Sequence, residues 1–279
     1  MKIFGTRFSL IGDIVMSLPI LDYLKDKYGE YYMYFSIAKK CEQSAPIFYN
    51  HPLINSIKIS DHHEDLGEND FEIISKCDLV FNVKPPHPQE QDWYNYRNCI
   101  EETALMAGLD PKLFKDKIPL LKQYWDDECA YEKTIAIWPF AGYGQGLERS
   151  PSKEWWELLI HNLTNSGYKI LHFGVDNEPN LSNNENYKKI TNLSFFEQIK
   201  YSLCCNAVIG TDSGSMWVTA AYNKIPQINL ITNWLPNHFQ NKLALAPIGE
   251  KTINLYADNG CSNISIEETV FKINEIFRI

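Results

Sequence analysis

NAVIGTDSGSMW, residues 206–217, combines a short apolar run, a turn and the start of a helix. The run at 207–209 is typical of a strand buried in a parallel sheet, and apolar residues from Met216 onward begin a helix. A helix N-terminus presents backbone N–H groups and a partial positive charge, which together bind phosphate. We therefore predict a phosphate-binding turn, with an ordinary capped turn as the alternative. Its residues are Asp212, Ser213, Gly214 and Ser215.

Strand and helix patterns alternate through the rest of the chain. Runs of apolar and β-branched residues predict strands, and amphipathic segments between them predict helices. Such alternation favours α/β domains with doubly wound parallel sheets. The expected strands are a first one that begins near Ile3 and ends at Ile11, and then 31–38, 54–59, 77–83, 134–138, 169–173, 207–209, 227–231 and 252–255. The expected helices are 14–28, 41–49, 93–108, 193–204 and 266–277, with one more that begins at Ser150-Pro151 and buries Trp155, Leu158, Leu159 and Leu163.

A domain boundary is predicted between two such alternating regions. Residues 111–133 contain Pro119 and a charged run, and they show no clear period. We therefore expect an N-terminal domain at 1–130 and a C-terminal domain at 131–279. The last helix could pack back on the first domain.

Composition limits the partners of the chain. The formal net charge of −9 over 279 residues argues against a nucleic-acid partner, because binding to nucleic acid needs a basic face. The seven cysteines include no C-x-x-C pair, which favours buried, reduced thiols in a cytoplasmic protein. No apolar run reaches the length that crosses a membrane, so membrane contact is expected to be peripheral at most.

Gly12 and Asp13 are expected at the carboxyl end of the first strand, where open α/β sheets bind ligands. Asp13 there has two interpretations. It could cap the following helix, or it could act as a general base that takes a proton from a substrate hydroxyl. The residues alone leave both open.

A glycine-rich loop follows the strand at 134–138. Gly142 and Gly144 can turn backbone N–H groups toward an anion, although a flexible surface loop explains them equally well. Lys153 then lies near the start of a helix, where a cation opposes the helix dipole. A ligand phosphate shared between Lys153 and the glycine loop would remove this conflict.

Acidic residues follow the strand at 169–173. A carboxylate in this position, such as Glu178, often accepts hydrogen bonds from ribose hydroxyls in nucleotide-binding domains. A solvated acidic loop is the alternative. Another acidic loop contains His62 and His63, but adjacent residues cannot share one face of a helix or strand, so we expect no metal there.

In order and spacing, these pieces resemble glycosyltransferase family 9, which includes the ADP-heptose:lipopolysaccharide heptosyltransferases. The matching pieces are IGD at 11–13 with Pro19, SKEW at 152–155, Gly174 with downstream carboxylates, and GTDSG at 210–214 followed by Ala220-Ala221 and Ile225-Pro226. The resemblance implies a GT-B fold: two Rossmann-like domains face a central cleft, the first holds the acceptor and the second the sugar nucleotide.

The resemblance also implies a reaction. It is an inverting, metal-independent transfer of a heptose or related sugar from a nucleotide-diphosphate sugar to a hydroxyl of a glycan or glycolipid. Asp13 would be the base, and the turn at 212–215, the glycine loop and Lys153 would stabilise the leaving diphosphate. No cofactor is expected, and no D-x-D motif, the usual metal-binding signature, occurs in the sequence.

Trp217 departs from the family pattern, which usually has histidine at this position. The indole could line the donor site beside the turn, or it could pack in the core. The departure keeps a catalytically silent sugar-nucleotide- or glycan-binding protein open as an alternative function. A sugar-nucleotide 2-epimerase, which also uses two Rossmann-like domains, is another.

Overall fold

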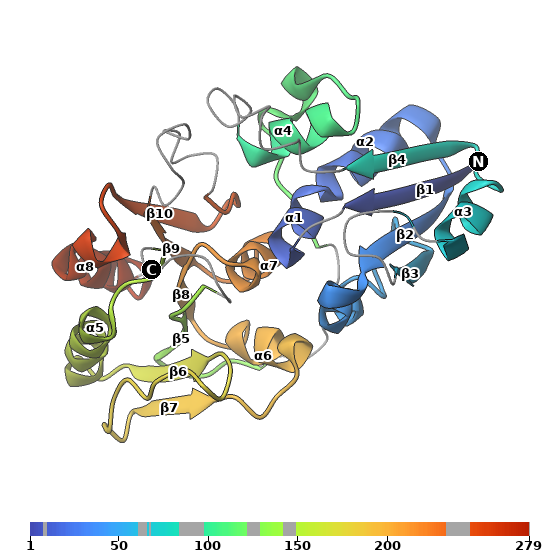
Figure 1. The fold of residues 1–279 in the computed structure, drawn as a ribbon. Helices are drawn as coiled ribbons and strands as arrows, with labels where there is room; N and C mark the ends of the chain where they lie inside the picture. The colour runs from blue at the N-terminus through green and yellow to red at the C-terminus, as the bar shows by residue number, and fades with distance from the viewer. Residues whose placement is uncertain are drawn as a thin grey trace. The chain divides into compact units, whose positions relative to one another are not determined.

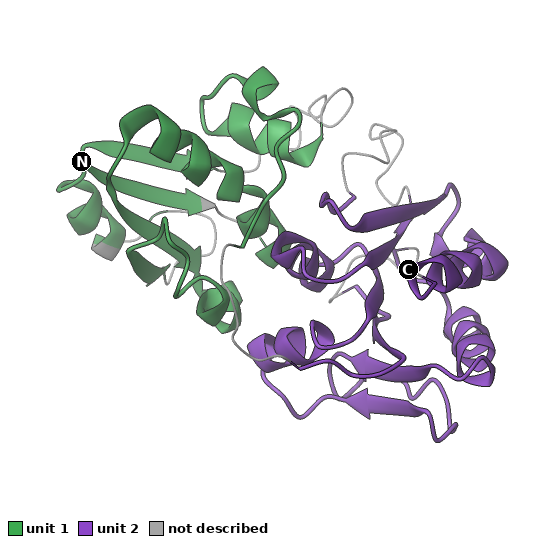
Figure 2. Ribbon diagram, turned by 180° about the vertical axis from the view of Figure 1, so that it is seen from behind, with its two compact units in different colours: residues 1–124 green, residues 125–279 purple. Residues whose placement is uncertain are grey.

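The computed structural model describes residues 1–7, 10–60, 66, 68–83, 98–121, 129–141, 149–232 and 246–278. The chain divides into two compact units, Met1–Tyr124 and Trp125–Ile279 (Figure 2). Each unit contains one parallel sheet flanked by helices (Figure 1). The predicted α/β class with two Rossmann-like regions is confirmed. The sequence predicts a boundary after residue 130, and the structure divides the chain after Tyr124.

Unit 1 has a four-stranded sheet in the order β3-β2-β1-β4. Its elements are β1 (Lys2–Arg7), α1 (Ile11–Met16), α2 (Leu18–Tyr28), β2 (Tyr32–Ala38), η1 (Lys39–Ile47), β3 (Ser56–Ser60), α3 (Glu68–Ile74), β4 (Leu79–Val83), α4 (Cys99–Met106) and η2 (Pro111–Phe114). The helix predicted at 41–49 is the 3₁₀ segment η1, which contains Pro46. Proline has no N–H for an α-helical hydrogen bond, which accounts for the difference.

Unit 2 has a six-stranded sheet in the order β10-β9-β8-β5-β6-β7. Its elements are β5 (Thr134–Trp138), α5 (Lys153–Asn165), β6 (Lys169–Phe173), β7 (Tyr187–Ile190), α6 (Phe195–Ser202), β8 (Ala207–Thr211), α7 (Gly214–Tyr222), β9 (Gln227–Thr232), β10 (Thr252–Ala257), η5 (Cys261–Asn263) and α8 (Ile266–Ile276). Figure 1 shows α5 and α8 on one face of this sheet, and α6 and α7 on the other.

The helices on the first face differ in detail from the prediction. Ser152, not Ser150, caps α5, since its hydroxyl accepts a hydrogen bond from the N–H of Trp155 at 3.2 Å. Leu158 is 51% exposed, whereas Trp156 is fully buried. The last helix, α8, packs on the core of unit 2 through Ile273, and a contact with the first domain stays a prediction.

Strand β7 was not predicted from the sequence. It is a four-residue strand at the edge of the sheet, and it carries the adjacent lysines Lys188 and Lys189. Short, charged edge strands are common because they discourage pairing with other chains, but their composition hides them from a search for apolar runs.

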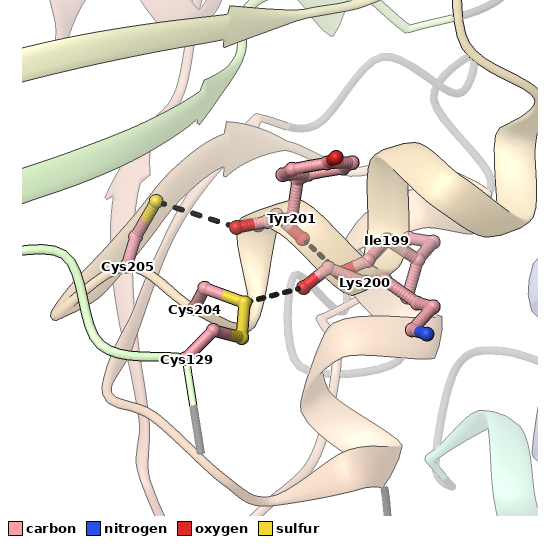
Figure 3. Close-up of a disulfide and its surroundings, with 7 residues drawn as sticks. Cys129, Ile199, Lys200, Tyr201, Cys204 and Cys205 are labelled. Carbon is pink, nitrogen blue, oxygen red and sulfur yellow. Dashed lines mark hydrogen bonds between the residues drawn. A yellow bond between two sulfur atoms is a disulfide. The ribbon is translucent and has the colours of Figure 1, made fainter. Parts of the chain in front are cut away.

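Cys129, which precedes β5, forms a disulfide with Cys204, which follows α6 (Figure 3). The backbone N–H of Tyr131 also donates to the carbonyl of Cys204 at 2.9 Å, next to this bond. Cys205 is a free, buried thiol whose pKa burial raises to about 12. The expectation of reduced thiols throughout was therefore wrong for Cys129 and Cys204.

A chain of buried polar side chains joins α7 to the neighbouring strands. Gln227 in β9 donates to the carbonyl of Met216 at 2.8 Å and accepts from the Thr219 hydroxyl at 2.5 Å. It also donates to Asn229 at 2.6 Å, and Asn229 donates to Asn254 in β10 at 2.6 Å. Helix α7 is thus hydrogen-bonded to strand side chains as well as packed on them.

Among the described residues, none of the helices is both long enough and apolar enough to cross a membrane.

Candidate functional site

The candidate residues of unit 2 follow strands that end at one edge of its sheet. The chain runs from β5 outward to β6 and β7, and then returns to place β8 on the other side of β5. Such a reversal of strand order marks the usual ligand-binding position of an open α/β sheet, outside the carboxyl ends of the strands. The carboxyl ends of β5, β6 and β8 therefore lie at one edge of the sheet.

The turn after β8 leads directly into α7, as predicted. Ser213 precedes the helix with extended backbone, and its hydroxyl lies 2.9 Å from that of Ser215. Gly214 is the first residue of the nine-residue helix. The helix N-terminus, with its N–H groups and two hydroxyls, thus lies at the carboxyl end of a central strand.

Arg149, which the sequence analysis missed, holds this turn. Its Nη2 donates to the carboxylate of Asp212 at 2.8 Å and to the carbonyl of the same residue at 2.9 Å. Both side chains are nearly buried, at 12% and 10% exposure. The Arg149 carbonyl in turn accepts from the thiol of Cys261 at 3.2 Å. A buried guanidinium is thereby fixed beside the N-terminus of α7.

Two buried polar atoms at the same edge have no hydrogen-bond partner among the described residues. They are the indole Nε1 of Trp138, the last residue of β5, and the hydroxyl of Thr211, the last residue of β8. The indole stacks on Phe173 with ring centres 5.5 Å apart. Buried donors without partners are rare, so these two atoms favour water or a ligand at this edge.

Glu178, in the loop after β6, is bound to a buried histidine. Its Oε2 lies 2.9 Å from Nε2 of His172, and Nδ1 of His172 lies 2.7 Å from the hydroxyl of Tyr187. The histidine is fully buried, and the side chain of Glu178 is 15% exposed. His172 was not predicted, since a lone histidine in a strand gives no pattern.

Lys153 is the first residue of α5, and its Nζ lies 3.3 Å from the carboxylate of Glu157 on the same helix. Both side chains are about half exposed. Gly142 and Gly144 lie outside the described residues. Their roles, and that of Lys153, stay predictions.

Trp217 is 1% exposed and ranks among the largest fully buried side chains. Almost the whole of α7 is buried, from Ser215 to Ala221. Burial favours the core alternative for this indole, and a contact with the donor stays a prediction.

Asp13, in unit 1, lies in the first turn of α1 and not at the end of the strand, because β1 ends at Arg7. Gly12 beside it is buried, and Asp13 is half-buried. The Oδ2 of Asp13 accepts a hydrogen bond from the N–H of Leu10 at 2.9 Å. Asp13 therefore stabilises the helix start, which is compatible with a second role as a base.

The described residues contain no cluster of three or more histidine, cysteine or acidic side chains that could hold a metal ion. His62 and His63 lie outside the described residues.

No family model matches the sequence, and no curated protein is similar to it at the level of sequence. Solved structures do resemble it. A family 9 glycosyltransferase from Veillonella parvula is 15% identical with a TM-score of 0.72, and the match covers 99% of this chain and 96% of that one. ADP-heptose lipopolysaccharide heptosyltransferase II from E. coli is 15% identical with a TM-score of 0.71, and the match covers 99% of this chain and 98% of that one. E. coli heptosyltransferase WaaC, solved with ADP, is 12% identical with a TM-score of 0.67, and the match covers 99% of this chain and 100% of that one.

Two further structures bear on the open questions. The iron-containing glycosyltransferase TibC from E. coli aligns at a TM-score of 0.63 with 13% identity, covering 99% of this chain and 76% of that one. A putative UDP-N-acetylglucosamine 2-epimerase from Listeria monocytogenes aligns at a TM-score of 0.53 with 12% identity, and the match covers 100% of this chain and 88% of that one. Transferases agree better with this chain than the epimerase does. The chain therefore shares the GT-B fold of the family 9 glycosyltransferases.

Proposed function

We propose that this protein is a glycosyltransferase that moves a heptose or related sugar from a nucleotide-diphosphate sugar to a hydroxyl of a glycan or glycolipid. The observation that carries the proposal is the buried pair of Arg149 and Asp212 beside the N-terminus of α7. A cation and a helix N-terminus at one sheet edge suit a diphosphate. Structures of the same fold have been solved with ADP and with an ADP-heptose analogue.

The proposed reaction is a direct displacement. The oxygen of the acceptor hydroxyl bonds to the anomeric carbon, the bond from that carbon to the diphosphate breaks, and the configuration inverts. Asp13 takes the proton of the hydroxyl, and the nucleoside diphosphate leaves with the electron pair of the broken bond.

Arg149 is the cation that we assign to the leaving diphosphate, in preference to Lys153. A guanidinium has five N–H donors and can bind an aspartate and a phosphate oxygen at once, whereas Lys153 is half exposed and pairs with Glu157. Ser213, Gly214 and Ser215 supply the remaining donors. Asp212 orients Arg149 and the turn, since an anion would repel phosphate.

We further propose that the transfer needs no metal and takes place in the cytoplasm, with peripheral membrane contact at most. The disulfide between Cys129 and Cys204 is unusual for a cytoplasmic protein, whereas the other five cysteines are free thiols.

A nucleotide screen followed by a turnover assay tests the proposal. We expect a thermal shift with one of ADP, GDP, UDP and CMP, because a ligand that binds the folded state raises the melting temperature. Turnover of the matching nucleotide sugar should release nucleoside diphosphate only when a glycan acceptor is added. Conversion of a UDP-sugar without acceptor would indicate the 2-epimerase. Binding without turnover across donors and acceptors would indicate a silent sugar-nucleotide-binding protein.

A further inference from the structure

We propose that His172 and Tyr187 are positioning residues that aim the carboxylate of Glu178 at the vicinal hydroxyls of the nucleotide ribose. The inference rests on the proposed function, because it takes the ligand of unit 2 to be a nucleotide. It adds two buried residues, neither of which touches the ligand, as the cause of a preference for ribose.

The hydrogen bonds among Tyr187, His172 and Glu178 all donate in the same direction, from the tyrosine through the histidine to the carboxylate. The N–H of Leu181 donates to the Tyr187 oxygen at 3.2 Å, which leaves the tyrosine proton for Nδ1 of His172 at 2.7 Å. The other ring nitrogen, Nε2, then carries the hydrogen and donates to Oε2 of Glu178 at 2.9 Å. Burial raises the pKa of the Tyr187 hydroxyl, which keeps its proton in place. Every donor in this series of hydrogen bonds has an acceptor only when His172 is neutral and Glu178 is ionised.

The arrangement leaves half of the Glu178 carboxylate for a ligand. Oε2 binds His172, whereas Oε1 has no hydrogen bond within the described part of the chain, and the side chain is 15% exposed. A carboxylate oxygen has two lone pairs, so Oε1 can accept from both hydroxyls of a ribose. The loop lies at the ligand-binding edge of the sheet.

The backbone of the loop is held by three hydrogen bonds from two side chains. Lys189 in β7 donates to the carbonyl of Glu178 at 2.5 Å and to that of Asp176 at 3.0 Å. Gln198 in α6 donates to the carbonyl of Gly174 at 3.1 Å. The carboxylate of Glu178 also lies against Gly174, where a Cβ atom would collide with it. A carboxylate fixed in this way loses little conformational entropy on binding, as expected of a preorganised site.

The test compares a nucleotide with its 2′,3′-dideoxy form. The nucleoside diphosphate that gives the largest thermal shift among ADP, GDP and UDP is titrated calorimetrically beside its dideoxy counterpart. For the unmodified protein we expect the ribose form to bind roughly tenfold to a hundredfold more tightly, the scale of hydrogen bonds to a charged group. Glu178→Gln should bring this ratio close to one.

Tyr187→Phe is the decisive variant, because it removes only the hydroxyl that fixes the His172 tautomer. We expect it to reduce the ribose-to-dideoxy ratio by about threefold or more while the Kd of the dideoxy form stays unchanged. His172→Phe should reduce the ratio further. Tyr168→Phe is the matched control, since it removes a partly buried hydroxyl that donates to Asn274 in the same unit, and it should leave the ratio unchanged.

The outcomes separate this inference from the proposed function. If the unmodified protein binds a nucleotide but Tyr187→Phe weakens both forms equally, or leaves the ratio intact, the positioning role is wrong and the proposed function stands. A ratio near one in the unmodified protein would likewise overturn only the inference. If none of the three diphosphates binds, both are overturned.

Discussion

Arg149 in unit 2 and Asp13 in unit 1 are held by contacts of very different range. Arg149 binds Asp212, which is 63 positions away in the sequence. Asp13 accepts a hydrogen bond from Leu10, three positions earlier. A residue held by distant partners depends on the fold of its whole unit, whereas one held by a helix turn keeps its place through local structure. Changes to Arg149 should therefore affect stability and binding together, whereas Asp13→Asn, which keeps the oxygen that accepts from Leu10, should affect mainly the chemistry.

The largest effect is expected from the covalent contact of unit 2. The disulfide Cys129–Cys204 joins residues 75 positions apart, and a cross-link of this span stabilises by about 4 kcal/mol in the chain-entropy description. We expect the double variant Cys129→Ser/Cys204→Ser to lower the free energy of unfolding of unit 2 by up to about that amount in a denaturant titration.

Two controls sharpen this measurement. Cys205→Ala changes the neighbouring free thiol and should have a much smaller effect. A reducing agent should destabilise the unmodified protein and leave the double variant unchanged. Equal stability of the unmodified protein with and without reductant would show that the bond contributes nothing.

Arg149→Leu should have the second-largest effect. It leaves the Asp212 carboxylate nearly buried without its cation, which costs about 3 kcal/mol of stability. Adding Asp212→Asn should restore part of the loss, because the uncompensated charge is gone. The single variant should also bind nucleoside diphosphate at least about tenfold more weakly while binding the nucleoside normally. Equal losses for both ligands, measured by calorimetry in a still-folded protein, would remove Arg149 from the phosphate site.

Asp13→Asn is expected to reduce transfer by about a hundredfold or more, which corresponds to about 2.7 kcal/mol in the barrier. An asparagine oxygen can still accept from the N–H of Leu10, so the melting temperature and donor affinity should not change. Asp26→Asn, at an exposed position on α2, is the control. Transfer at near the parent rate in Asp13→Asn would leave Asp13 as a helix-stabilising residue and nothing more.

Lys153→Ala should have the smallest effect. An exposed pair at i and i+4 contributes less than about 0.5 kcal/mol, and removing a cation from a helix N-terminus offsets part of that. We expect less than about a twofold change in nucleoside diphosphate affinity. A selective loss of diphosphate affinity in this variant would show that Lys153 binds the phosphate groups, contrary to the proposal that Arg149 does.

The sequence predicts best what depends on local pattern. The bounds of β5 and β6 agree with the apolar runs at 134–138 and 169–173, and a helix follows β8 as expected, although it begins at Gly214 and not at Met216. Each of these signals lies within a few residues, where periodicity and turn chemistry act directly.

Contacts between distant segments lie beyond the reach of such patterns. Arg149 meets Asp212, and Cys129 meets Cys204, only because the strand order brings their segments together. Trp217 shows a second limit. Apart from Ser215 and Thr219, the first turns of α7 are apolar, so periodicity did not decide whether Trp217 faces the core, and the structure buries nearly all of the helix.

The polar chain from Gln227 to Asn254 has a consequence for motion. Because Gln227 bonds both Met216 and Thr219, α7 cannot slide along the sheet without breaking several buried hydrogen bonds at once. The turn at its N-terminus should therefore fluctuate together with β9 and β10 as one rigid body. Amide hydrogen exchange in α7 should be as slow as in those strands and should slow little further when a nucleotide binds. Differences among donor sugars would then be accommodated by other segments while α7 stays in place.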